Sequence, residues 1–316
     1  MSALLTIVIP VYNREDLVLR TLNSVAASTS SDFRLVVVDN ASTDSSYAVC
    51  QGWVEEHRKK GLNVELLMEP TPGAPAARNR GLSACETPWV YFFDSDDLFD
   101  DLFVASFIEM LPADDVDMFC FPIRQEVNGH IAVRSYTPTA DAAVHVINSM
   151  LSTPAVVFRT SWLRTLGGWN EHLEIWQDWE LGLRALLSKP RLRWFTGDAF
   201  HHIIVHPDSI TGRNFTETVQ GLALTMNIGL QDVRDASALT TAEKQRLQTA
   251  FYFRARIMAG KLAKEGNEAG RELFHVIAGK CGERVSMTQN LMAHVLEVYT
   301  AHGGRGAWRL VLWMLK

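Results

Sequence analysis

Two short apolar runs in this chain each end in acidic residues, and this layout constrains the fold more than any other feature. Residues 89–93 are bulky and apolar and lead into Asp94 and Asp96, while residues 35–38 lead into Asp39. Apolar runs of this length are typical of buried strands. In open α/β sheets, ligands bind beyond the carboxyl ends of the strands. We therefore expect both strands to deliver carboxylates to one rim of a sheet, where oxygen ligands can hold a divalent cation.

Composition narrows the class of protein. The 316 residues are 47% hydrophobic, which is enough to build a full core. A formal charge of −6 argues against a nucleic-acid partner, because phosphate contacts need a basic excess. The four cysteines contain no CxxC pair, so we expect neither a zinc cluster nor a disulfide framework and favour a reducing cytoplasm. No stretch reaches the roughly 18 uninterrupted apolar residues of a membrane span, so we expect a soluble or peripheral protein.

The first half of the chain alternates strand-like runs with helical periodicity, which predicts βαβ wiring. Asn13 is a candidate cap for the first helix. The pair Asn128 and Gly129 predicts a hairpin between residues 117–125 and 131–136, at the edge of the sheet. The predicted strands are residues 6–11, 34–38, 63–68, 89–93 and 155–158, and the predicted helices are residues 43–60, 76–82 and 177–187.

Beyond about residue 213 the strand signals nearly vanish, and helical stretches run to the end. We therefore expect an α/β domain over residues 1–212 and a helical region over residues 213–316. The last segment, residues 303–316, mixes tryptophans and aliphatic side chains with basic residues. It fits a helix packed on the protein or on a second subunit of an oligomer, and it also fits a peripheral contact with the inner face of a membrane.

Several segments, in order along the chain, resemble family 2 inverting glycosyltransferases of the GT-A fold. The resemblance covers roughly residues 4–212. It implies a Rossmann-like, mixed α/β sheet with helices on both faces. The segments that carry it are residues 7–13, 37–44, 72–73 with 77–81, 93–97, 167–171 with 177–181, and 206–210. Among them, residues 167–171 resemble the family's acceptor-side segment.

The family's reaction implies a donor, an acceptor and two kinds of catalytic group. A sugar leaves a nucleotide diphosphate, commonly UDP, and joins a hydroxyl of a glycan or glycolipid with inversion, in cell-surface polysaccharide synthesis. The departing pyrophosphate gains negative charge, which Mn²⁺ or Mg²⁺ can neutralise. By resemblance Asp96 is the metal ligand and Asp94 lies near the ribose. Asp39 accepts a hydrogen bond from the base, and the guanidinium of Arg78 lies close to the nucleotide.

The remaining roles also follow from the resemblance. Pro10 and Tyr12 would line the base pocket, and Ser95 would lie in the donor-binding segment. His206 would contact the metal or the pyrophosphate. A zinc site built from two histidines four apart is not indicated, because residues 203–205 between them are strand-like. The family's catalytic base maps onto Asp178.

The pair of acids at the family's base position is incomplete here, because Gln177 precedes Asp178. A glutamine can still donate and accept hydrogen bonds, so it can orient a substrate. If the family's first acid is itself the base in this branch, Gln177 would lower activity. Asp178 and Glu180 are the two carboxylates near this position, and we favour Asp178.

Each of these assignments has a structural alternative. Asp39 can begin an Asx turn, the acids at 94–97 can form a solvated turn, and Arg78 can lie on a solvated helix face. Trp169, Trp176 and Trp179 can be core residues or a platform for a sugar. Two other functions remain open. One is a sugar nucleotidyltransferase, although the loop after the first strand lacks the expected glycines, and the other is a non-catalytic nucleotide- or glycan-binding protein.

Overall fold

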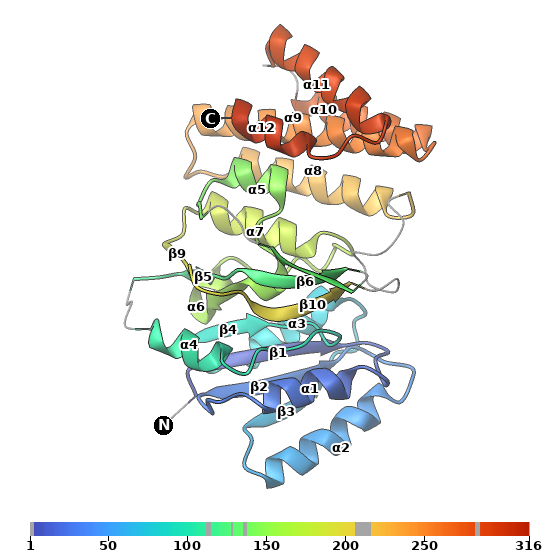
Figure 1. Cartoon of the computed structure of the whole chain (residues 1–316). Coiled ribbons are helices and arrows are strands. Elements are labelled where there is room, and N and C mark those ends of the chain that lie inside the picture. The colour runs from blue at the N-terminus through green and yellow to red at the C-terminus, as the bar shows by residue number, and fades with distance from the viewer. Residues whose placement is uncertain are drawn as a thin grey trace. The chain divides into compact units, whose positions relative to one another are not determined.

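The structure is a computed structural model, and it describes residues 3–111, 115–127, 129–134, 138–205, 216–281 and 285–315. The chain forms two compact units (Figure 1). The first contains residues 1–138, 152–174 and 190–207, and the second contains residues 139–151, 175–189 and 208–316. The helical region predicted after residue 213 therefore shares its unit with two earlier segments. A single boundary does not capture this division.

The first unit is built on a seven-stranded sheet in the order β3-β2-β1-β4-β8-β5-β9. The four strands β1 to β4 are parallel, β8 is antiparallel to both of its neighbours, and β9 is parallel to β5. This is the mixed α/β sheet that the sequence predicts. The strands are β1 (Leu5–Val11), β2 (Phe33–Asp39), β3 (Val64–Met68), β4 (Trp89–Phe92), β5 (Met118–Cys120), β8 (Val156–Arg159) and β9 (Leu192–Trp194).

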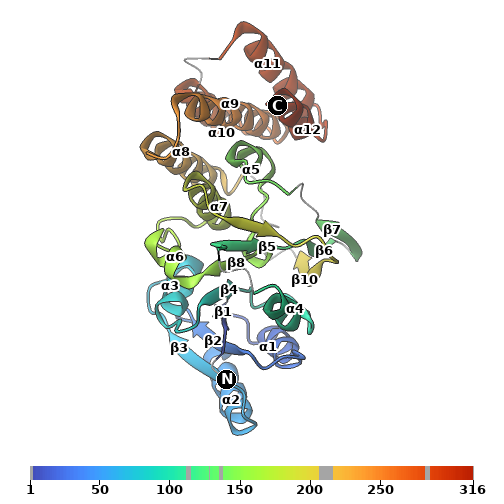
Figure 2. The same ribbon diagram turned by 90° about the vertical axis from the view of Figure 1, so that its left-hand side faces the viewer.

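Helices cover both faces of this sheet, which is why the central strands are mostly apolar. In β1, Ile7 and Ile9 join the core under α1, α2 and α4, while Val8 points to the opposite face and meets α3. Figure 2 shows α1 and α4 on one side of the sheet and α3 and α6 on the other. The helices are α1 (Val18–Ala26), α2 (Ser46–Lys59), α3 (Ala74–Ser83), α4 (Phe103–Glu109) and α6 (Thr160–Thr165).

A smaller sheet of three strands lies in the same unit, in the order β10-β6-β7. The predicted hairpin is present, because β6 (Ile123–Val127) pairs antiparallel with β7 (His130–Arg134). Its predicted place at the edge of the main sheet is wrong. Pro122 has no backbone N–H for a ladder, and the chain leaves the main sheet after β5 and enters the small sheet at β6. The third strand is β10 (Phe200–Val205).

The predicted cap of the first helix is also wrong. Helix α1 begins at Val18, and the preceding Leu17 makes no side-chain capping bond. Asn13 has a left-handed backbone, with φ of 48°, and its side-chain oxygen accepts a hydrogen bond from the amide of Thr43 at 2.8 Å. A contact across 30 residues therefore takes the side chain that local spacing assigned to the helix.

The second unit consists of helices around its own apolar core. Large side chains such as Trp179, Leu183, Phe251 and Phe274 are buried in it. The four cysteines of the chain are buried free thiols in the two units. The helices are α5 (Ala142–Asn148), α7 (Gln177–Leu187), α8 (Val219–Asp235), α9 (Thr241–Lys264), α10 (Glu268–Cys281), α11 (Met287–Ala301) and α12 (Ala307–Met314).

The terminal segment divides its side chains between core and surface. In α12, Ala307 and Val311 are buried, and the helix contacts α5 and α9. On its other side Trp313 is 73% exposed. None of the helices in the described part of the chain is both long and apolar enough to cross a bilayer.

Candidate functional site

The carboxyl ends of β1, β2 and β4 bring most of the predicted site residues to one rim of the main sheet. Val11, the last residue of β1, is in register with Asp39 at the end of β2. The amide of Phe93, at the exit of β4, donates to the carbonyl of Val8 in β1. Asp94 and Asp96 follow directly. Pro10 is buried in β1, and Tyr12 just beyond this strand is 53% exposed.

Asp39 is a buried carboxylate with one unsatisfied oxygen. Its side chain is at the end of β2, and the residue is 1% exposed. Oδ2 accepts a hydrogen bond from the amide of Ser42 at 3.2 Å. Oδ1 is buried without a hydrogen-bond partner among the described residues. Leaving such an oxygen unpaired is costly, so this atom marks a place where a ligand can donate a hydrogen bond.

Asn40 holds the loop that closes the rim beside Asp39. Its side-chain amide donates to the carbonyls of Glu69 and Thr71 at 3.1 and 2.7 Å. Its side-chain oxygen accepts from the amide of Gly73 at 2.8 Å. Gly73 has φ of 125°, which favours glycine, and it directly precedes α3. The end of β2 therefore fixes the point at which α3 begins.

Arg78 lies on α3 between a carboxylate and an aromatic face. Its guanidinium donates to Oδ1 of Asp94 at 2.8 Å and stacks on Trp169 at 4.5 Å from the ring centroid. The Arg78 side chain is mostly buried. This contradicts the alternative of a solvated helix face. The arrangement places a fixed cation beside the acids that follow β4.

Asn79, the next residue on α3, fixes the segment that resembles the family's acceptor side. Its amide donates to the carbonyl of Trp169 at 2.9 Å and to Oε1 of Glu171 at 2.7 Å. Its oxygen accepts from the amide of Trp169 at 2.8 Å. Gly168 has no room for a side chain here, because a Cβ would lie 2.6 Å from the Asn79 oxygen. No role is predicted for Asn79 from the sequence, although it lies next to Arg78.

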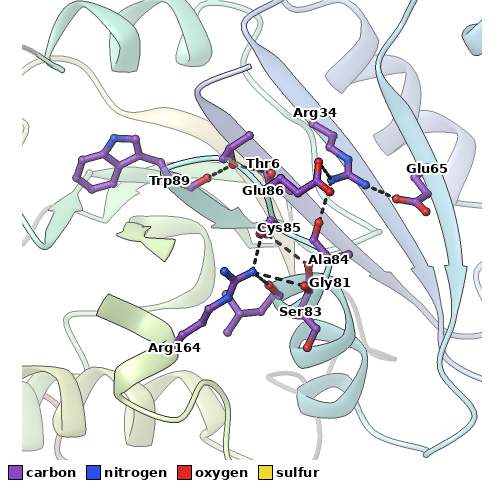
Figure 3. Close-up of polar contacts among 12 residues, drawn as sticks. Thr6, Arg34, Glu65, Gly81, Ser83, Ala84, Cys85, Glu86, Trp89 and Arg164 are labelled. Carbon is purple, nitrogen blue, oxygen red and sulfur yellow. Dashed lines mark hydrogen bonds and ion pairs between the residues drawn. The ribbon is translucent and has the colours of Figure 1, made fainter. Parts of the chain in front are cut away.

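Helix α3 is anchored along its length. A Cβ on Gly81 would lie 2.2 Å from Cγ1 of Val8, so the helix backbone rests directly on β1. At the C-terminal end, Arg34 donates to the carbonyl of Ala84 at 2.9 Å, and Arg164 donates to that of Cys85 at 2.6 Å (Figure 3). The last carbonyls of a helix have no partner within it, so Arg34 satisfies a group that would otherwise need water, while Arg164 binds the carbonyl just beyond the helix.

Asp96 is partly buried and lies among basic side chains. A guanidinium nitrogen of Arg14 lies 3.4 Å from its Oδ2. Arg20 on α1 donates to its backbone carbonyl at 2.5 Å. Ser95, beside it, is buried. Neither arginine was assigned to the site from the sequence, since each is more than 70 residues away from Asp96 along the chain.

Asp97 ties the acid cluster to β10. Its Oδ1 accepts from the amide of Ile204 at 2.8 Å, and its carbonyl accepts from Thr21 on α1. Burial, together with the nearby carboxylates of Asp94 and Asp96, raises the pKa of Asp97 well above its usual range. His206 follows β10 directly, but it lies outside the described residues.

The possible metal ligands on the rim are too few to enclose an ion, and they suit a cation that is held jointly by the protein and by a ligand. Across the described ranges, no three histidine, cysteine, aspartate or glutamate side chains gather as ligands. Mg²⁺ is usually held through one or two carboxylates together with substrate phosphates. Asp96 can provide such a carboxylate. The rim therefore fits a cation that arrives with a diphosphate.

The residues predicted at the catalytic base lie in the second unit, at the start of α7. Gln177 is buried, and Asp178 is partly exposed. Oδ1 of Asp178 accepts from the amide of Trp179 at 2.8 Å. Glu180 is buried, and its two oxygens accept from Arg184 at 2.7 and 3.0 Å. This pairing leaves Asp178 as the more accessible of the two carboxylates.

The tryptophans considered as a sugar platform are mainly core residues. Trp169 and Trp179 are 3% and 1% exposed. Trp176 is partly buried and lies against Arg254, whose guanidinium is 4.7 Å from the ring centroid. A buried ring cannot present its face to an acceptor. The core interpretation therefore holds for Trp169 and Trp179.

Comparison with known sequences identifies relatives over part of the chain. The family model described as Glycosyl transferase family 2 matches residues 6–162, about half of the chain. The poly(ribitol-phosphate) beta-N-acetylglucosaminyltransferase TarS of Staphylococcus aureus is 26% identical over 204 residues, covering 62% of this chain and 35% of TarS. The teichoic acid poly(glycerol phosphate) polymerase of Staphylococcus epidermidis is 28% identical over 192 residues, covering 58% of this chain and 26% of the polymerase. The chain thus spans well under half the length of these two relatives.

Solved structures agree with the sheet described above. The crystal structure of S. aureus TarS 1–349 in complex with UDP-GlcNAc has a TM-score of 0.71 at 19% identity, covering 99% of this chain and 92% of that one. The mannosyltransferase PcManGT from Pyrobaculum calidifontis, in complex with GDP-Man and Mn²⁺, has a TM-score of 0.60 at 16% identity, covering 100% and 84%. At these identities the likeness establishes the fold. The chain has the GT-A fold and belongs to glycosyl transferase family 2.

Proposed function

We propose that this protein transfers a sugar from a nucleotide diphosphate sugar to a hydroxyl of a glycan or lipid-linked acceptor, with inversion, in the synthesis of a cell-surface polymer. The observation that carries the proposal is the buried Oδ1 of Asp39, which has no partner among the described residues and lies at the rim of the sheet. An N–H on the edge of a nucleotide base would satisfy it. UDP is the nucleotide to test first, because TarS was solved with UDP-GlcNAc.

In this proposal different residues of the rim contact different parts of the nucleotide sugar. Pro10 and Tyr12 line the base beside Asp39, while Asp94 and Ser95 lie along the ribose and Arg78 holds Asp94 in place. Asp96, with His206, would hold a Mn²⁺ or Mg²⁺ ion, which supplies Lewis acidity and a template for the phosphates when bound. Arg14 now contacts Asp96, and it is free to turn toward a phosphate once the carboxylate has another partner.

Asp178 is the proposed base that removes the proton of the acceptor hydroxyl. The bidentate pair of Glu180 with Arg184 supports this choice, since a buried and paired carboxylate is a poor proton acceptor. Gln177 would orient the acceptor through its amide. Polyol phosphate polymers of the teichoic acid type are the acceptors to test first, because TarS and the polymerase act in that chemistry by name.

Calorimetry with UDP in the presence of Mn²⁺ tests the donor site. Asp39→Asn should weaken UDP binding by about tenfold or more, because it replaces a carboxylate oxygen that accepts hydrogen bonds with an NH2 group that donates them. Asp198→Asn, an exposed acid in the same unit, is the matched control and should bind normally. Asp96→Asn should remove the dependence of affinity on Mn²⁺. Equal affinities for all three folded variants would refute the donor site.

Turnover tests the reaction and the base. With an accepted donor and polymer, Asp178→Asn should keep UDP affinity and lose about 10²-fold or more in rate, the usual scale of general-base catalysis. Gln177→Ala should lose much less. NMR of the product should show an anomeric configuration opposite to that of the donor. Donor binding without transfer to any hydroxyl would instead indicate a non-catalytic binding protein, and near-normal turnover in Asp178→Asn would move the role of base to another group.

A further inference from the structure

The second unit exposes a continuous apolar stripe along α11. The stripe recurs at intervals of four and three residues, so its members lie on one face of the helix. Met287 is 90% exposed and Leu291 is 65% exposed, and neighbouring apolar side chains with this much exposure to water mark a candidate interaction surface. The members of the stripe are Met287, Leu291, Val295, Val298 and Tyr299.

The opposite face of α11 is occupied by the core of its unit. Ala293, Leu296 and Thr300 are buried there, and a Cβ on Gly260 of α9 would lie 2.4 Å from the carbonyl of Glu297. The helix therefore cannot turn its stripe inward without losing this packing. The stripe is a surface feature of the folded unit.

The surface continues into α12 through a short turn. The hydroxyl of Tyr299, at the end of the stripe, donates to the carbonyl of Arg305 at 3.0 Å. Helices α11 and α12 contact each other. On the exposed side of α12 lie Leu310, Trp313 and Arg309. We call the stripe together with Arg305, Arg309, Leu310 and Trp313 the α11–α12 surface.

The charge of this surface is opposite to that of the whole chain. The protein has a formal charge of −6, yet the single acid between residues 285 and 315 is Glu297. Glu297 is 3% exposed and pairs with Arg256 at 2.7 Å and Arg271 at 3.3 Å. Arg305 and Arg309 are exposed. The α11–α12 surface is thus apolar, carries tryptophan and is positively charged.

We propose that the α11–α12 surface docks on an anionic lipid bilayer, with the apolar side chains at the acyl boundary and the two arginines on lipid phosphates. Tryptophan favours the membrane interface, and basic residues beside an apolar helix face add attraction to anionic lipid. A second copy of the chain seated face to face is a poorer occupant. It would bring two pairs of arginines together, and residues 285–315 of the described chain offer no exposed acid to pair with them.

Sedimentation of the intact protein with vesicles tests this docking. Binding should be strong to vesicles containing phosphatidylglycerol, weak to pure phosphatidylcholine, and reduced by salt, which screens exposed charges. Leu291→Glu and Trp313→Glu should each reduce binding at least tenfold. The matched control is Leu224→Glu, an exposed leucine on α8 outside this surface, which should bind normally.

The arginines provide a second, independent measurement. Arg305→Gln and Arg309→Gln should each weaken binding about fivefold, the effect of one basic residue at an anionic surface. Lys59→Gln, exposed on α2 in the first unit, should have no effect. The melting temperature and UDP affinity should be unchanged in every variant, so the outcome is separate from that of the donor site.

Two results would overturn the proposal. One is intact protein that ignores phosphatidylglycerol vesicles. The other is a monomer-to-oligomer equilibrium, measured by sedimentation velocity, that Trp313→Glu abolishes while vesicle binding is unchanged. The second result would assign the surface to contacts between copies of the chain.

Discussion

The contact of α3 with β1 makes a sharp prediction about a single methyl group. In Gly81→Ala the new Cβ would lie 2.2 Å from Cγ1 and 3.0 Å from Cγ2 of Val8. Val8 is fully buried in β1, which is paired with β2 on one side and β4 on the other, so it cannot give way easily. Overpacking of this kind costs about 1–3 kcal/mol.

A second effect opposes the clash. Alanine is about 0.5–1 kcal/mol better than glycine inside a helix. We therefore expect Gly81→Ala to lower the free energy of unfolding by about 1–2 kcal/mol. Gly52→Ala on α2 is the matched control, because nothing lies within 4 Å of a Cβ there. It should raise the free energy of unfolding by about 0.5–1 kcal/mol, so the same substitution has opposite signs on two helices.

Urea unfolding followed by circular dichroism measures both variants, and a double-mutant cycle isolates the contact. Val8→Ala removes both Cγ atoms and with them the clash. The loss of unfolding free energy in the double variant should therefore be smaller than the sum of the two single losses by about 1 kcal/mol or more. UDP affinity should decrease in Gly81→Ala, because the displaced helix carries Arg78, and recover in the double variant. Stabilisation of Gly81→Ala by as much as Gly52→Ala would refute the reasoning.

Three further predictions test charge and positioning. Burial lowers the pKa of His201 from 6.5 to about 3, so the unfolded state takes up a proton before the folded state as the pH falls, and stability is lost below about pH 6.5. Urea unfolding measures the free energy of unfolding at each pH. Between about pH 7 and pH 5 this free energy should fall by about 2 kcal/mol less in His201→Asn than in the parent protein, and equal losses would contradict the buried neutral imidazole. Arg184→Gln leaves Glu180 buried without its partner and should cost about 3 kcal/mol in unfolding free energy, which Glu180→Gln should largely restore; a marginal loss in Arg184→Gln would mean that water already reaches the pair. Asn79→Ala should raise the KM for acceptor more than that for donor, because the segment at Trp169 loses its hydrogen bonds, and equal changes in both would place its role elsewhere.

The sequence predicts the sheet and the rim well, because both depend on local patterns. The strand exits at Asp39 and Asp94 are visible as apolar runs that end in acids, and the helix at residues 177–187 has the predicted bounds. The family resemblance supplied the choice of Arg78. The structure adds that Arg78 pairs with Asp94 and is buried.

The parts that the sequence missed depend on contacts between distant residues. Asn13 binds Thr43 rather than capping a helix, and Arg14 reaches Asp96 across 82 residues. No periodicity within a window of one element encodes such a pair. The break at Pro122 is different in kind, since a proline within a predicted strand is a local signal that argues against one continuous strand. It could have been used.

The interleaving of the two units has a consequence for synthesis on the ribosome. The chain passes from one unit to the other after residues 138, 151, 174, 189 and 207. Helices α5 and α7 are therefore made before the buried partners of Trp179 on α8 and α9, which leave the exit tunnel later. Until then these helices carry exposed apolar faces, for which a chaperone is the natural partner. A protein cut near residue 212 should retain that state permanently, and the missing C-terminal third should be needed for solubility as much as for activity.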